Sequence, residues 1–70
     1  MTAKETQVGG DHYQRLRIQP IDFILANEIP FCEANAIKYL CRWRHKNGIQ
    51  DLEKARHYID LLIESINGSH

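Results

Sequence analysis

The stretch NAIKYLCRWRHKNG, residues 35–48, decides the fold of this chain. At 100° per residue, Ile37, Leu40 and Cys41 share one side of a helix. The other side is polar and mostly basic, and it carries Asn35, Lys38, Tyr39, Arg42, His45 and Lys46. Because Gly48 is typical of the position just after a helix, the pattern predicts an amphipathic helix from about residue 32 to residue 46.

The flanking segments predict two further helices. Pro20 suits the first turn of a helix, so one is expected from Pro20 to about residue 27 or 28. Asp51 is a favourable N-cap residue, and apolar residues recur at helical spacing from there to Ile66, just before Gly68. The connection at residues 46–50 is short, which predicts an antiparallel hairpin of the second and third helices. The expected fold is all-α, with a short N-terminal segment and three helices.

The size of the chain predicts a homo-oligomer. Its 70 residues form at most one domain, residues 1–70, and a domain this small gains little from its own core. The polar residues 1–8 are expected to be flexible. Tyr58 lies at the edge of the polar side of the last helix, and Leu61 lies within that side. Both are therefore candidate contacts between subunits.

Charge and composition exclude several classes of partner. Lys+Arg and Asp+Glu both number 9, so the formal net charge is zero. Nucleic-acid-binding proteins usually carry a basic excess, and no nucleic acid partner is expected. No apolar run is long enough for a membrane span, and the N-terminus is too polar for a signal peptide. With Cys32 and Cys41 interpreted as reduced thiols, we therefore expect a cytoplasmic protein without a membrane partner.

The strongest candidate site is the basic side of the central helix. Asn35, Lys38, Arg42 and Lys46 step by three or four residues, so they line one side of a single helix. Lys and Arg supply charge-assisted donors, Asn supplies a donor and an acceptor, and Tyr39 lies beside them. Phosphates together with a base would suit this set. A solvated helix surface has the same pattern, so the residues alone leave both interpretations open.

Two His-Tyr pairs, His12-Tyr13 and His57-Tyr58, are further candidates. Imidazole and phenol groups contact phosphates and stack on bases, but they are also ordinary surface residues. The chain has no CxxC or HxxxH pair and no phosphate-binding GxxxxGK[ST] loop. The sequence therefore predicts no metal site, no cofactor and no catalytic residue.

A series of short motifs extends over almost the whole chain, from Gly9 to Glu64. In order they are Asp11-His12-Tyr13, Ile18-Gln19-Pro20-Ile21-Asp22-Phe23-Ile24, Asn35-Ala36-Ile37-Lys38-Tyr39-Leu40 with Arg42, Lys46-Asn47-Gly48, Asp51-Leu52, Lys54-Ala55 and His57-Tyr58. This combination resembles the small phage-encoded SaV-like family. Members of that family are often labelled nucleotide-kinase-like. The resemblance implies a nucleotide ligand and, for a phage protein, the host cytoplasm.

With the resemblance, our preferred hypothesis is an oligomer that binds a nucleotide at a subunit interface and keeps it from other proteins. It is similar in kind to phage proteins that sequester the cyclic nucleotide signals of host defence. Lys38, Arg42 and Lys46 would contact phosphates, and Asn35 would read a base or ribose. The remaining candidates, His12, Tyr13, Tyr39 and His57, would flank or close the site. The alternatives are a deoxynucleoside monophosphate kinase that pools residues from several subunits and an adaptor for a host protein.

Overall fold

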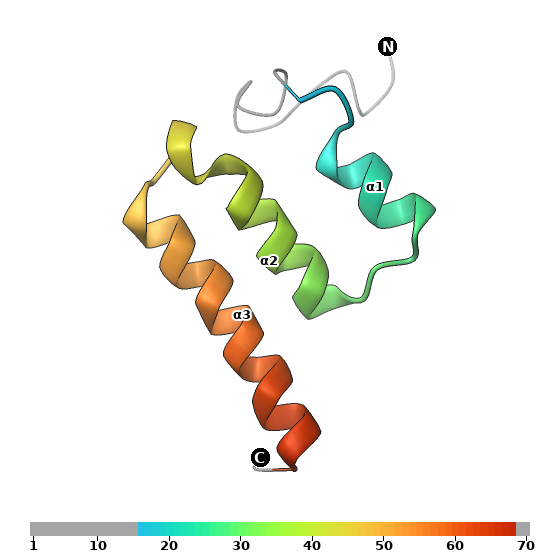
Figure 1. Ribbon diagram of the computed structural model, residues 1–70, viewed down its shortest axis with the longest axis vertical. Coiled ribbons are helices and arrows are strands. Elements are labelled where there is room, and N and C mark those ends of the chain that lie inside the picture. Colours follow the sequence, from blue (N-terminus) through green and yellow to red (C-terminus); the bar gives the residue numbers. More distant parts are fainter. Residues whose placement is uncertain (1–15, 69–70) are drawn as a thin grey trace.

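The computed structural model describes residues 16–68, and in this range every regular element is helical. Figure 1 shows the elements in chain order. They are α1 (Pro20–Ala26), α2 (Phe31–Arg42), the 3-10 helix η1 (Trp43–His45) and α3 (Ile49–Asn67). The all-α fold predicted from the sequence is confirmed.

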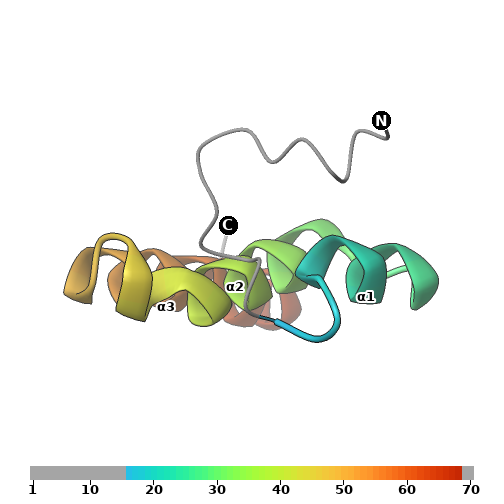
Figure 2. The ribbon, with the colours of Figure 1, turned by 90° about the horizontal axis from the view of Figure 1, so that it is seen from above.

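The helices α2 and α3 form the expected antiparallel hairpin, and α1 packs against the other side of α2. Among the described residues, no Cα atom of α1 lies within 8 Å of a Cα atom of α3. Seen from above, the three helices lie in one layer (Figure 2). The hairpin therefore presents two broad faces. None of the described helices is both long enough and apolar enough to cross a membrane.

The buried apolar side chains of α2 and α3 are small. Ala36 of α2 and Ala55 of α3 are 7% and 2% exposed, and they are the only buried apolar residues on these two helices. Alanines at these two positions let the helix backbones approach closely. The larger aliphatic side chains remain half-buried or exposed, so the chain buries little apolar surface by itself.

The α-helical part of α2 ends at Arg42, four residues before the end that the sequence pattern predicts. The next three residues tighten into η1, and the N–H of Gly48 donates to the carbonyl oxygen of Trp43 at 2.9 Å. Gly48 has φ 57° and ψ −127°, a conformation that is essentially restricted to glycine. The predicted glycine stop is therefore confirmed, but a 3-10 turn separates it from the α-helix.

The predicted N-cap role of Asp51 is wrong. The helix α3 begins at Ile49, with Gly48 at the capping position, so Asp51 lies inside the first turn. Its side chain is fully buried and bonds to Arg42 and Asn47 instead of the amides of its own helix. The N-cap prediction considers only the residues that neighbour Asp51 in the sequence. Its partner Arg42 belongs to the preceding helix, so the prediction could not include it. At the other end, Gly68 adopts the left-handed conformation and ends α3 as expected.

Candidate functional site

The carboxylate of Asp51 ties α2, the connecting turn and α3 together. The Arg42 guanidinium donates from Nε to Oδ2 and from Nη2 to Oδ1, both at 3.2 Å. Asn47 adds its backbone N–H at 3.2 Å and its side-chain Nδ2 at 3.4 Å. Such a fork-shaped pair fixes the plane of the guanidinium as well as its position.

The bonds to Asp51 also keep it ionised. Burial acts to raise the pKa of this carboxyl group, but the hydrogen bonds from Arg42 and Asn47 and the charge of Arg42 outweigh it. The net result is a pKa below the ordinary value for aspartate. At neutral pH the Asp51 carboxylate is therefore charged and holds the Arg42 side chain against the hairpin.

An aromatic cluster lies beside this ion pair, where α2 meets α3. The rings of Tyr39 and Tyr58 are near parallel, with centroids 6.1 Å apart and planes 14° apart. Phe31 meets Tyr58 edge-on at 6.0 Å, and His57 does so at 5.7 Å. Contacts of this kind contribute beyond the apolar area that they bury. They hold the two tyrosine rings as a fixed surface.

Three cationic side chains surround the ring of Tyr39. The Lys38 ammonium lies 4.8 Å from the ring centroid, the Arg42 guanidinium 4.7 Å and the Lys54 ammonium 5.4 Å. Cations are attracted to an aromatic face. The Arg42 guanidinium is also paired with the carboxylate of Asp51. Positively charged groups therefore gather around the Tyr39 ring, although the formal net charge of the whole chain is zero.

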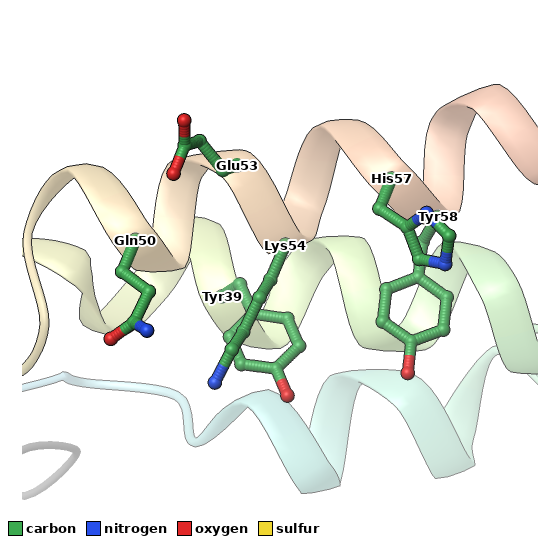
Figure 3. Close-up of a pocket in the computed structure, with 6 residues that line it drawn as sticks. All are labelled: Tyr39, Gln50, Glu53, Lys54, His57 and Tyr58. Atoms are coloured by element: carbon green, nitrogen blue, oxygen red, sulfur yellow. The ribbon is translucent and has the colours of Figure 1, made fainter.

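Tyr39 and Lys54 border an open groove of about 360 Å³ on one broad face of the hairpin. We call it the tyrosine groove; its lining residues are Tyr39, Gln50, Glu53, Lys54, His57 and Tyr58. In Figure 3 the two tyrosine hydroxyls, the Lys54 ammonium and the Gln50 amide point to the same side, while the Glu53 carboxylate points away. Glu53 lies 3.9 Å from Arg56, an exposed neighbour on α3. The groove thus presents aromatic rings and donors together.

The structure brings four of the predicted site residues together. Lys38, Tyr39 and Arg42 of α2 and His57 of α3 meet at or beside the tyrosine groove.

The other predicted site residues do not line the groove or lie outside the described part of the chain. The Nδ2 of Asn35 donates to the carbonyl oxygen of Phe31 in its own helix, at 2.9 Å. Lys46 follows η1 and does not line the groove. His12 and Tyr13 lie outside the described residues.

The contribution of α3 is what sequence reasoning missed. Lys54 and Tyr58 are four residues apart and therefore share one side of α3, which they present to Tyr39. From the sequence, Tyr58 is expected at a contact between subunits, and Lys54 has no role in the predicted site. The four-residue spacing of Lys54 and Tyr58, with His57 adjacent, is the feature of the sequence that could have indicated this part of the site. Only the packing of the hairpin shows that this side of α3 faces Tyr39.

Other chemistry has little support in the described residues. Within residues 16–68, no group of three or more His, Cys, Asp or Glu side chains comes close enough to hold a metal ion. Burial raises the pKa of the Cys41 thiol, so this group is protonated at neutral pH and is a poor nucleophile. The arrangement is therefore suited to binding through stacking and charge.

Comparison with known proteins places the chain in a family. A family model described as a protein of unknown function, DUF3310, matches residues 8–60. The chain belongs to the DUF3310 family. The matched range contains α2 and every residue that lines the tyrosine groove. No curated protein and no solved structure matches the chain.

Proposed function

We propose that this protein binds a nucleotide in the tyrosine groove and sequesters it from other proteins. The observation that carries the proposal is the arrangement around Tyr39, where three cations surround one aromatic ring. A phosphate group would accept charge-assisted hydrogen bonds from these cations, and a base would stack on the half-buried tyrosine rings. A nucleotide combines both groups in one small molecule.

The shape of the groove supports a small ligand. Its volume of about 360 Å³ is at the lower end of the range of ~300–1,000 Å³ for small-molecule sites. Lys54 would contact the phosphate, and the Gln50 amide offers both a donor and an acceptor to a base or ribose. Because the Asp51 carboxylate holds the Arg42 guanidinium in place, that cation loses little rotamer freedom when an anion binds.

Sequestration is the simplest role for such a site. Binding needs only the rings and cations that the hairpin already positions, whereas phosphoryl transfer also needs a metal-held donor aligned with an acceptor. The resemblance to phage-encoded proteins points to a nucleotide of the host cytoplasm, including the cyclic signals of antiviral defence. In this role the ligand is held and released without chemical change.

Calorimetry with a panel of nucleoside mono-, di- and triphosphates, cyclic mononucleotides and cyclic dinucleotides tests the proposal. We expect one class to bind and its affinity to fall as salt rises, because the ligand is held by cations in a groove that is open to solvent. Lys54→Gln should weaken binding, and the matched control Arg56→Gln should leave it unchanged, since Arg56 is exposed and does not line the groove.

The fate of the ligand separates sequestration from catalysis. After incubation with magnesium and ATP, the released nucleotide is analysed by mass spectrometry, and we expect its mass to be unchanged. A phosphorylated product would replace sequestration with the kinase activity. Absence of binding across the whole panel would overturn the proposal.

A further inference from the structure

Two asparagines of this chain are followed directly by glycine, in the pairs Asn47-Gly48 and Asn67-Gly68. Asparagine is a chemically labile residue. In such a pair the backbone nitrogen of the glycine can attack the side-chain amide carbon of the asparagine, because glycine has no Cβ to hinder the approach. Both asparagines are exposed to solvent, so exposure alone does not distinguish the two pairs. Their hydrogen bonds do.

The reaction is deamidation, and water is its only co-reactant. The glycine nitrogen loses its proton to the solvent and forms a bond to Cγ of the asparagine. The bond between Cγ and the side-chain nitrogen breaks, and this nitrogen takes up a proton and leaves as ammonia. Water then opens the resulting succinimide ring at one of its two carbonyl carbons, which gives aspartate or isoaspartate. The attack therefore requires a side chain that is free to turn toward the next backbone nitrogen.

Both reacting groups of Asn47-Gly48 are held by the folded hairpin. The side-chain Nδ2 of Asn47 donates to Oδ1 of Asp51 at 3.4 Å, and the backbone N–H of Asn47 donates to Oδ2 at 3.2 Å. The N–H of Gly48 donates to the carbonyl oxygen of Trp43 at 2.9 Å. The attack would break the bonds from Nδ2 and from Gly48, and it would develop negative charge near the Asp51 carboxylate. The fold therefore opposes deamidation at this pair.

The other pair, Asn67-Gly68, is held much less. Asn67 is the last residue of α3, and the described residues give its side chain no hydrogen-bond partner. The N–H of Gly68 donates to carbonyl oxygens in the last turn of the same helix, those of Glu64 and Ser65. The end of a helix frays at little cost in free energy. Fraying of this turn brings the Gly68 nitrogen within reach of the Asn67 side chain.

We propose that Asn67 is the site at which the folded protein deamidates, and that Asp51 protects Asn47 from the same reaction. The protection preserves the hairpin, because aspartate at position 47 would place a second carboxylate against Asp51 in place of a donor amide. At Asn67 the reaction adds a negative charge to the C-terminal end of α3, where the helix dipole disfavours it. This proposal does not depend on what the tyrosine groove binds.

Peptide mapping of the full chain after incubation at mildly alkaline pH tests the proposal. Trypsin cleaves after Lys46, Lys54 and Arg56, so the two asparagines fall in separate peptides. Mass spectrometry with chromatography resolves each peptide into its asparagine, aspartate and isoaspartate forms. In the folded protein we expect Asn67 to react at least about tenfold faster than Asn47, as the loss of a hydrogen bond to a charged group implies. In urea, where neither pair keeps its bonds, the two rates should converge.

Asp51→Ala isolates the protecting carboxylate. We expect the rate at Asn47 to rise about tenfold and the rate at Asn67 to stay unchanged, because only Asn47 loses its acceptor. Glu53→Ala is the matched control, since its carboxylate is exposed and lies beside Arg56. It should change neither rate. Circular dichroism restricts the comparison to conditions in which each variant keeps the helix content of wild type.

Equal rates at the two pairs in the folded wild type would overturn the proposal. So would a difference that persists in urea, because the neighbouring sequence and not the fold would then be its cause. An unchanged rate at Asn47 in folded Asp51→Ala would remove the protecting role of the carboxylate. If Asp51→Ala does not fold, the comparison of folded and urea-treated wild type decides by itself.

Discussion

The two broad faces of the α2–α3 hairpin differ in how their large side chains are placed. On the groove face, Tyr39 and Tyr58 contact each other, and Tyr39 also contacts the surrounding cations. On the opposite face, which we call the apolar face, Leu40 of α2 and Ile63 of α3 are half exposed. A face whose side chains are held by their neighbours is prepared for a ligand, whereas an aliphatic face without a cover is prepared for another protein surface. This difference separates the proposed ligand site from the surface where a contact between subunits is expected.

The largest effect is expected where both faces depend on one contact. Asp51→Ala leaves the Arg42 guanidinium without its carboxylate at a nearly buried position, and we expect a loss of about 2 to 4 kcal/mol in the free energy of unfolding. Both self-association and nucleotide binding should fall with it. Urea denaturation followed by circular dichroism measures the loss.

The exposed ion pair between Glu53 and Arg56 is the matched control for this change. Glu53→Ala should cost less than about 0.5 kcal/mol, because exposed pairs contribute little. A loss for Asp51→Ala no larger than that of the control would show that the buried pair does not hold the hairpin.

Leu40→Asp tests whether the apolar face acts independently of the groove. Each copy would bring a carboxylate into the expected contact between subunits in place of a half-exposed leucine, so we expect the dissociation constant of self-association to rise about a hundredfold. Sedimentation gives that constant, and calorimetry of the same variant should give a nucleotide affinity within about threefold of wild type. Equal losses in both measurements would place the ligand at the subunit interface instead.

Lys54→Ala tests the tyrosine groove without changing the apolar face. Removing the ammonium near the Tyr39 ring should weaken nucleotide binding about tenfold, as expected for the loss of one charge-assisted hydrogen bond at an open site. Self-association should be unaffected, because Lys54 lies on the side of α3 opposite the apolar face. Calorimetry at two salt concentrations should also show a smaller salt dependence for the variant. Unchanged binding would remove Lys54 from the site.

The smallest effect concerns the pH dependence of stability. The pKa of Asp51 is lower in the folded protein than its ordinary value of about 3.9, so the stabilisation is complete above the ordinary pKa. This stabilisation is lost as the pH falls from the ordinary pKa of aspartate through the lower pKa of Asp51 in the folded protein. Wild type should therefore lose stability faster than Asp51→Asn below about pH 4, as measured by urea midpoints. Parallel curves for the two proteins would contradict this.

Local sequence features predicted most of the fold. Pro20 starts α1 as expected, and the hairpin follows from the short connection between two amphipathic segments. Gly68 ends α3 because glycine readily adopts the left-handed conformation. These features depend on residues that are neighbours along the chain, and the helical period is sufficient to recognise them.

The candidate site was only half predictable. The spacing of Lys38, Tyr39 and Arg42 marked one wall of it, because all three belong to one helix. The other wall, Lys54 and Tyr58, belongs to α3, and its side chains are ordinary surface residues until α3 packs against Tyr39. The contact between Arg42 and Asp51 likewise joins two helices.

The sequence by itself determined three helices, a hairpin and a basic strip on α2. Only the tertiary structure decided that Asp51 holds Arg42, that Tyr58 and Lys54 complete the groove, and that the aliphatic side chains of the hairpin remain uncovered on the opposite face. The physical reason is that helix formation follows from the period and end signals of one segment, whereas a site formed by two segments depends on their rotation about their axes.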